Sequence, residues 1–206
     1  VHQNFPGQFE HLAPALAARG DEVVAMGMNG ARSAAGIRVL NSQGKYQTGA
    51  GHPWARDFDT KIIRAEASLQ TAKALYDEGF HPDVIVAHPA WGEALFLKQV
   101  WPEARLGLYC EFYYHANGLD FDFDPEFSGP IGPDTRCRAM LKNIPQRLHF
   151  DVANAGLCPT RFQADTYPEP FRSRITVIHD GIDTARVAPG PGEVRIGERR
   201  LDGNDE

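Results

Sequence analysis

The sequence has few cysteines, and they are far apart. Three occur in 206 residues, at Cys110, Cys137 and Cys158, and no Cys-x-x-Cys is present. An odd number of widely spaced cysteines argues against a disulfide framework and against the common structural zinc sites. The sequence therefore predicts reduced thiols, a cytoplasmic location and no metal site.

Long apolar runs and blocks of positive charge are also missing. No segment approaches the roughly 18 consecutive apolar residues that a membrane-spanning helix needs. The net charge is −6 and no run of lysine or arginine occurs, which argues against a protein that binds nucleic acid. With 42% hydrophobic and 23% charged residues, the composition is that of an ordinary globular protein.

What the sequence does contain is an alternation of strand-like and helical segments. Several strand-like runs are continuously apolar, which is typical of parallel strands covered on both faces. The longest helical pattern runs from Ala55 to Glu78, and further helices are expected at Phe9–Ala18, Gly92–Val100, Thr135–Val152 (bent at Pro145) and Thr160–Tyr167. The expected strands are Val23–Met26, Ile37–Leu40, Val84–His88, Arg105–Glu111, Ala155–Pro159 and Ile175–Ile178. This order predicts an α/β, Rossmann-like, doubly wound parallel sheet with its ligand at the carboxyl ends of the strands.

In the long helical pattern, apolar residues recur at spacings of three and four, which predicts a single buried face. Its members are Phe58, Ile62, Ala65, Leu69, Ala72 and Tyr76.

The N-terminal segment reads as a strand end, a turn and a helix. Val1 and His2 are all that represents the first strand, which we therefore expect to be truncated. Glycine in the turn would let the backbone approach a ligand, and the next helix would direct its free N–H groups toward the same place. The alternative is a plain strand-to-helix connection. The candidate substrate-binding residues of this turn are Asn4, Pro6, Gly7 and Gln8.

Two later strand ends carry polar and aromatic residues that suit the wall of a sugar or nucleotide site. His88 and Trp91 follow the Val84 strand, where the alternative is a helix N-terminus with Trp91 packed inward. The Ile175 strand is followed by a turn, which could equally be only a turn. Its candidate residues are His179, Asp180 and Gly181.

The strand that begins at Arg105 ends in a carboxylate. Glu111 follows an apolar run, where a charge is unfavourable unless it has partners or a role. His115 lies four residues later and could face the same cleft, and Tyr113 between them could stack on a sugar ring. We expect Glu111 and His115 to be catalytic. The alternative is that Glu111 pairs with an arginine and His115 lies on the surface.

The segment Leu119–Phe127 alternates aspartate with apolar residues. It could form an edge strand, but a mobile acidic loop is preferred. Asp120, Asp122 and Asp124 match the start of a calcium-binding loop, yet the following glycine is missing and Ile131 stands at the twelfth position. We therefore do not expect calcium there.

Beyond the last strand the composition changes. Residues 188–192 read as a linker, and the remaining residues form a polar tail with no partner element. We therefore expect a domain at residues 1–187, and at 188–206 a linker and tail that lead to an absent C-terminal domain.

Five segments together resemble the N-terminal half of a family 4 glycosyltransferase with the GT-B fold. The closing turn, with its Asp-Gly-Ile-Asp sequence, is the most specific of them. The matching segments are His2–Phe9, His11–Gly20, Pro82–His88, Glu111–His115 and Val177–Asp183.

The resemblance implies two Rossmann-like domains that face each other across a cleft. The N-terminal domain would hold the acceptor, and the absent C-terminal domain would hold the nucleotide-sugar donor. It further implies a retaining hexosyltransferase that needs no metal or other cofactor, and a chain that is inactive alone. The family's active-site histidine usually ends a central strand, a place that Glu111 holds here with His115 close behind.

The resemblance also implies a carbohydrate or lipid-linked acceptor, and a full-length protein that could associate peripherally with membranes. Two other functions stay open. One is a non-catalytic module that binds a sugar or nucleotide by itself. The other is an oxidoreductase, although no Gly-x-Gly-x-x-Gly follows the first strand.

Overall fold

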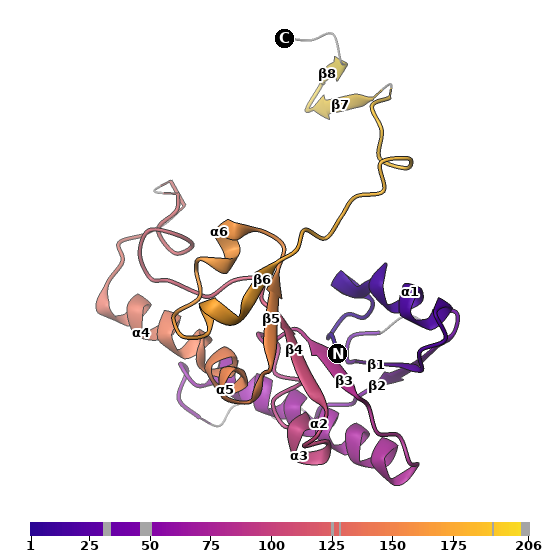
Figure 1. The fold of residues 1–206 in the computed structure, drawn as a ribbon. Coiled ribbons are helices and arrows are strands. Elements are labelled where there is room, and N and C mark those ends of the chain that lie inside the picture. The colour runs from indigo at the N-terminus through magenta and orange to yellow at the C-terminus, as the bar shows by residue number, and fades with distance from the viewer. Residues whose placement is uncertain (31–33, 46–50, 125, 128, 191, 203–206) are drawn as a thin grey trace.

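Strands and helices alternate along most of the chain in the computed structural model (Figure 1). The structure describes residues 1–30, 34–45, 51–124, 126–127, 129–190 and 192–202. Three parts of the segments discussed above lie outside the described residues, namely Pro125, Pro191 and residues 203–206.

Six strands form two parallel sheets. One sheet pairs β1 with β2, and the other has the order β3-β4-β5-β6. The predicted parallel α/β fold is thus confirmed. Each strand lies within about two residues of its predicted bounds: β1 Val23–Gly27, β2 Ile37–Asn41, β3 Val84–Ala87, β4 Arg105–Tyr109, β5 Ala155–Cys158 and β6 Ile175–Val177.

Helices lie between the consecutive strands from β2 to β6, whereas the described residues between β1 and β2 contain none. Helix α2 packs against α3, α4 and α5, while α1 contacts β1 and β2, and α6 contacts β5 and β6. The helices are η1 Gly7–Phe9, α1 Leu12–Ala18, α2 Arg56–Asp77, α3 Leu97–Val100, α4 Pro133–Lys142, α5 Ile144–Val152, α6 Arg161–Ala164 and η2 Arg172–Arg174.

Apolar cores lie on both faces of the sheets. Alternate residues of β4 point to opposite sides, so that Leu106 and Leu108 join the larger core, and Tyr109 joins the smaller. Leu75 of α2 belongs to the larger core, and Phe9 belongs to the smaller. The sheet is therefore covered on both faces, as a doubly wound fold requires.

The buried face of α2 differs from the prediction. Ala65 and Ala72 are buried as expected, but Tyr76 is 47% exposed and Leu75 takes the inner position. The inner face also contains Ser68. Small side chains at these positions let neighbouring helices approach α2 closely. The buried side of α2 is therefore the side with the small residues.

Three predicted helices are shorter than expected. The predicted Phe9–Ala18 helix begins only at Leu12, after the turn of η1, and the predicted Gly92–Val100 helix is helical only over α3. The third is α6, which spans Arg161–Ala164 and is capped by the Thr160 hydroxyl, 3.2 Å from the Gln163 amide nitrogen. Turns replace the missing helical residues.

The predicted Thr135–Val152 helix is two helices. Asn143 ends α4 and begins α5, so the break lies just before Pro145. Proline has no N–H, and the first turn of a helix is the place where that donor is not needed. The proline therefore starts a new helix instead of bending one.

A gap separates β1 from β3. Val1–Gln3 lie between the carboxyl ends of these two strands, with His2 N donating to Met26 O (3.1 Å) and His88 N donating to Val1 O (3.3 Å). Val84, at the amino end of β3, is 57% exposed. Apolar surface near the amino end of β3 is therefore uncovered.

The polar C-terminal segment forms a hairpin, so the prediction that it has no partner element was wrong. Strands β7 (Glu193–Ile196) and β8 (Arg199–Asp202) pair antiparallel across Gly197 and Glu198. Gly197 has φ +60°, which suits a two-residue hairpin turn. Figure 1 shows the hairpin at the end of an extended linker, away from the sheets.

The acidic segment after β4 contains no strand among its described residues. Each aspartate accepts a hydrogen bond from a nearby backbone amide: Asp120 from His115, Asp122 from Gly118, and Asp124 from Glu126. Aspartates that cap amides in this way stabilise turns, so their alternation in the sequence reflects local turn formation.

Candidate functional site

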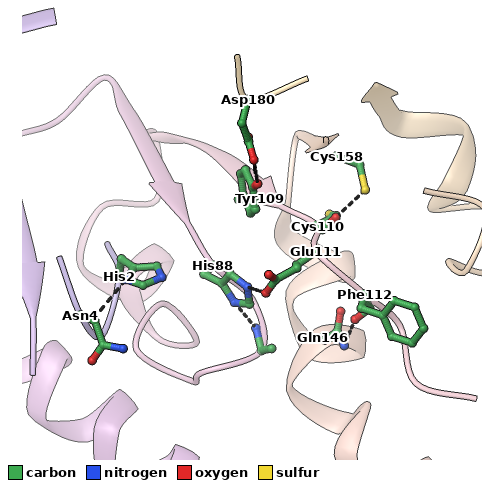
Figure 2. A network of polar contacts seen from close by, with 11 residues as sticks. His2, Asn4, His88, Tyr109, Cys110, Glu111, Phe112, Gln146, Cys158 and Asp180 are labelled. Carbon is green, nitrogen blue, oxygen red and sulfur yellow. Dashed lines mark hydrogen bonds and ion pairs between the residues drawn. The ribbon is translucent and has the colours of Figure 1, made fainter. Parts of the chain in front are cut away.

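The carboxyl ends of β3 and β4 bring His88 and Glu111 into contact. Nε2 of His88 lies 2.9 Å from Oε2 of Glu111 (Figure 2). Adjacent parallel strands place the residues that follow them at one edge of the sheet, which explains the contact. The His88 side chain is buried, while the Glu111 carboxylate is 44% exposed and thus accessible from solvent.

The hydrogen bonds of His88 define its tautomer. The backbone N–H of Ala90 donates to Nδ1 at 3.3 Å, so the proton of the neutral ring is on Nε2 and is donated to Glu111. This bond is the main reason that the pKa of Glu111 is lowered, and it outweighs the opposing effect of burial. Trp91 lies beside the ring, with centroids 5.3 Å apart. His88 is therefore fixed from several sides and holds Glu111 ionised.

The N-terminal turn reaches the same place through His2. The rings of His2 and His88 meet edge to face, with centroids 5.9 Å apart. The Asn4 N–H donates to Nδ1 of His2 at 3.1 Å, and burial lowers the pKa of His2 to about 4. A Cβ on Gly7 would collide with the His2 ring. The glycine thus permits a close approach, but to a histidine of the chain.

Other predicted residues of this turn lie around His2. Gln8 is exposed and forms a side-chain hydrogen bond with the His2 ring. Asn4 is exposed and accepts a hydrogen bond from the Asn29 side chain at 3.1 Å. Pro6 is partly buried. The N-terminal turn and the loop that follows β3 therefore meet at His2 and His88.

The turn after β6 is attached to the sheet through Tyr109. The Tyr109 hydroxyl lies 2.7 and 2.9 Å from the two carboxylate oxygens of Asp180. Burial is the main reason that the pKa of the Tyr109 phenol is raised, and the hydrogen bond to Asp180 raises it further. His179 and Gly181 are exposed, and the Gly181 N–H donates to Nδ1 of His179 at 3.0 Å. This turn therefore joins the edge that carries Glu111, which follows Tyr109 by two residues.

His115 and Tyr113 lie on a different set of contacts. The His115 ring is 2.6 Å from the carbonyl oxygen of Thr166, to which Nε2–H donates. Tyr113 is buried, and its hydroxyl accepts from Nε of Arg147 at 2.7 Å. Within the described part of the chain, no hydrogen bond joins His115 to Glu111. The geometry thus puts His88, and not His115, next to the carboxylate.

Sequence reasoning did not single out a buried ion pair behind this edge. Glu93 is 2% exposed, and its Oε1 lies 3.8 Å from Nη1 of Arg64. Arg64 also donates to Oε1 of Gln3 at 2.5 Å, which links α2 to the N-terminal segment. Burial raises the pKa of Glu93. The signal in the sequence was a carboxylate inside an otherwise apolar segment.

Gly92 brings the His88 loop close to α2. Its φ is +98°, and a Cβ there would lie 2.5 Å from the carbonyl oxygen of Lys61. Lys61 is itself buried and pairs with Asp57. Glycine is therefore required at this position by both conformation and space.

Among the described residues, no cluster of three or more histidine, cysteine or carboxylate side chains could hold a metal ion. A search of the same residues found no helix with the length and apolar character needed to cross a bilayer.

A family model described as "Glycosyl transferase family 4 group" matches residues 19–187. The matched range contains β1 to β6 together with His88, Glu111 and Asp180. No curated protein matches the chain significantly.

Proposed function

Because the chain belongs to the family 4 group of glycosyl transferases, we propose that it forms the acceptor-side half of a retaining sugar-transfer site. The contact between His88 and Glu111, at the carboxyl edge of the parallel sheet, is the observation that carries the proposal. Ligands of open α/β sheets bind at this edge. The partly exposed carboxylate of Glu111 is a charged group there that a sugar can reach.

In the proposed reaction, a sugar moves from a nucleotide-sugar donor to an acceptor hydroxyl and keeps its anomeric configuration. The bond between the sugar and phosphate breaks, and positive charge develops on the sugar carbon. The departing phosphate takes the proton of the acceptor hydroxyl, so a strong protein base is not required. What the protein must supply is orientation and a negative environment.

Glu111 suits that role. Its lowered pKa keeps the side chain ionised near neutral pH, and its exposure leaves one side open to a hydroxyl group. His88 donates to Oε2 and thereby fixes the carboxylate, which makes it a positioning residue. The backbone N–H of His115 donates to Asp120, and its ring donates to the Thr166 carbonyl. These hydrogen bonds favour a role for His115 in stabilising its own loop.

Two further parts of the proposed site lie at the same edge of the sheet. Trp91 would offer an apolar ring to a sugar face, and the 179–181 turn would form the wall next to a second domain. The acceptor would be a carbohydrate or a lipid-linked sugar, and a second, C-terminal domain would bind most of the donor. No metal or other cofactor takes part in this proposal.

The test is an assay of a longer enzyme, in which this chain is followed by a second, donor-binding domain. Release of nucleoside diphosphate from UDP-, GDP- and ADP-hexoses is measured with simple sugars and lipid-linked sugars as acceptors. NMR coupling constants then give the anomeric configuration of the product. We expect transfer with retention that EDTA does not abolish. An inverted product would overturn the retaining mechanism, and the absence of any transfer or donor hydrolysis would favour a binding module.

The 206-residue chain serves as the matched comparison. We expect it to transfer no sugar, because the proposal assigns most donor contacts to the second domain. Transfer at a rate close to that of the longer enzyme would show that this chain holds the donor itself.

A further inference from the structure

Three buried polar side chains converge on the segment that follows Glu111. They are Asn143 and Gln146, at the junction of α4 and α5, and Thr166 in the turn after α6. Their exposed fractions are 4%, 0% and 4%. A buried amide or hydroxyl is unfavourable unless it is hydrogen-bonded, so the partners of these side chains show what they stabilise.

Two of these side chains bind the first residues of the segment. Nε2 of Gln146 donates to the carbonyl oxygen of Phe112 at 2.9 Å (Figure 2). The backbone N–H of Tyr113 donates to the hydroxyl oxygen of Thr166, also at 2.9 Å. The segment is therefore held by side chains where a strand would be held by the backbone of its neighbour.

Asn143 binds the third residue of the segment at both of its backbone groups. Its Oδ1 accepts from the Tyr114 N–H at 3.0 Å, and its Nδ2 donates to the Tyr114 carbonyl at 2.8 Å. The amide groups of Asn143 and Gln146 are themselves neighbours, with Oδ1 of the first 3.5 Å from Nε2 of the second. Both amides therefore act from one place, the break between α4 and α5.

Glu111 lies between this segment and the last contact of β4 with β5. On the strand side, the Cys110 N–H donates to the Leu157 carbonyl at 2.7 Å, and the Cys158 thiol donates to the Cys110 carbonyl at 2.6 Å. On the other side, the first group that is held is the Phe112 carbonyl. The backbone is thus fixed immediately before and immediately after Glu111 (Figure 2).

Only one half of the Gln146 side-chain amide is used. Its Oε1 is buried and has no hydrogen-bond partner among the described residues, whereas Nε2 donates to Phe112. An unpartnered buried acceptor lowers stability. The interaction that accounts for an amide at this position is therefore the bond to the Phe112 carbonyl.

We propose that Gln146 is a positioning residue, which holds the Glu111 carboxylate in contact with His88 by fixing the Phe112 carbonyl. The other two buried side chains extend the same restraint along the segment. Rotation of an unrestrained backbone would move the carboxylate, and a misplacement of about 1 Å can lower a rate by on the order of a hundredfold. The consequence for catalysis rests on the proposed function, in which Glu111 is the group that orients the sugar.

The experiment compares Gln146→Met with Gln99→Met in the 206-residue chain. Methionine is about as long as glutamine and fills the same space, but it has neither the donor nor the unpartnered oxygen. The fold should therefore persist, which thermal unfolding checks. Gln99 is exposed on α3, away from the segment, so the same substitution there is the matched control.

The first measurement follows the Nε2 proton of His88 by NMR. This proton is donated to Glu111 across 2.9 Å, so its exchange with solvent reports how constantly the carboxylate covers it. We expect exchange to be at least about fivefold faster in Gln146→Met than in Gln99→Met. Equal exchange rates would overturn the inference, because a glutamine with a purely structural role would change only the melting temperature.

A reference signal and a second variant complete the test. Exchange at the Leu106 amide, within β4, corrects for any change in overall stability. Asn143→Ala removes both bonds to Tyr114 and should speed exchange of the His88 proton by at least about twofold. If Gln146→Met does not fold, an unchanged rate in Asn143→Ala overturns the inference instead.

The activity of the longer enzyme separates this inference from the proposed function. We expect Gln146→Met to lower kcat about tenfold or more and to leave KM for the donor nearly unchanged. A faster-exchanging His88 proton together with unchanged kcat would support the positioning of Glu111 by Gln146 and count against the proposed role of Glu111 in sugar transfer.

Discussion

Nε2 of His88 lies 2.9 Å from Oε2 of Glu111, and this contact joins the loops that follow two neighbouring strands. The histidine is fixed by the Ala90 amide and by Trp91, whereas the carboxylate is partly open to solvent. The pair therefore combines a rigid donor with an accessible acceptor. Such an arrangement keeps a charged group in one orientation without closing it off from a ligand.

Replacing Glu111 with glutamine should lower kcat of the longer enzyme by on the order of a hundredfold, because the variant loses the negative charge near the reacting carbon. Folding should change little. The matched control is Glu103→Gln, since Glu103 is exposed before the amino end of β4. Steady-state kinetics and thermal unfolding of both variants give the comparison. Near-normal kcat in Glu111→Gln would leave the residue a structural role only.

Removing the His88 donor should raise the pKa of Glu111. His88→Leu eliminates the hydrogen bond that is the main cause of the lowered pKa, whereas His88→Gln keeps an N–H near the position of Nε2. Carbon-13 NMR of the Glu111 carboxyl during a pH titration measures the change. We expect a higher pKa in His88→Leu than in His88→Gln. The same pKa in both variants would mean that His88 does not control the ionisation of Glu111.

Tyr109→Phe should release the turn at residues 179–183. The variant loses both contacts to the Asp180 carboxylate, at a cost of roughly 1–3 kcal/mol for a hydrogen bond to a charged group, less what solvent screening removes. Hydrogen exchange at the Gly181 amide should become faster. Tyr76→Phe removes a hydroxyl from an exposed tyrosine on α2 and serves as the control. Equal exchange in the two variants would argue against a role for Tyr109 in holding the turn.

Gly92→Ala should destabilise the fold by more than the same change at Gly118. Both glycines have positive φ, +98° and +82°, so both substitutions carry the conformational cost of roughly 1 kcal/mol or more. Only at Gly92 would the new Cβ lie 2.5 Å from the Lys61 carbonyl, while open space surrounds Gly118. Urea unfolding of the two variants measures the difference, and equal losses would contradict the close approach of the loop to α2.

The fold should lose stability as the pH falls from 6.5 toward 4. Burial lowers the pKa of His149 to about 4, and the hydrogen bond from its Nδ1–H to the Pro145 carbonyl opposes this effect only in part. Its Nε2 has no partner among the described residues. The unfolded chain, with a histidine pKa near 6.5, binds the proton more readily in this pH range. Stability therefore falls as the pH decreases, by roughly 2 kcal/mol at pH 5.

The variant His149→Asn tests this origin of the pH dependence. Asparagine keeps a donor near Nδ1 but does not titrate, so the free energy of unfolding should vary less between pH 7 and pH 5. His2, whose pKa is also about 4, contributes in the same direction and leaves part of the slope. An unchanged slope in His149→Asn would mean that other groups dominate.

Much of the fold could be predicted because it is encoded locally. Continuous apolar runs such as Val84–Ala87 identified parallel strands, and the strands formed close to their predicted bounds. Helix ends were harder, since the predicted Gly92–Val100 helix is helical only over Leu97–Val100. The hairpin at residues 193–202 was missed although Val194 and Ile196 alternate with polar residues ahead of Gly197, a pattern that does indicate a hairpin.

The sequence by itself determined that polar residues follow the strands of a parallel sheet, because strand periodicity and turn residues act over a few positions. It named His88, Glu111 and Asp180 as candidates for that reason. Only the tertiary structure decided which of them meet. Glu111 contacts His88, which is 23 residues away, and not His115, because strand order and register bring β3 beside β4. Pairing of this kind depends on the packing of the whole sheet, which no local pattern specifies.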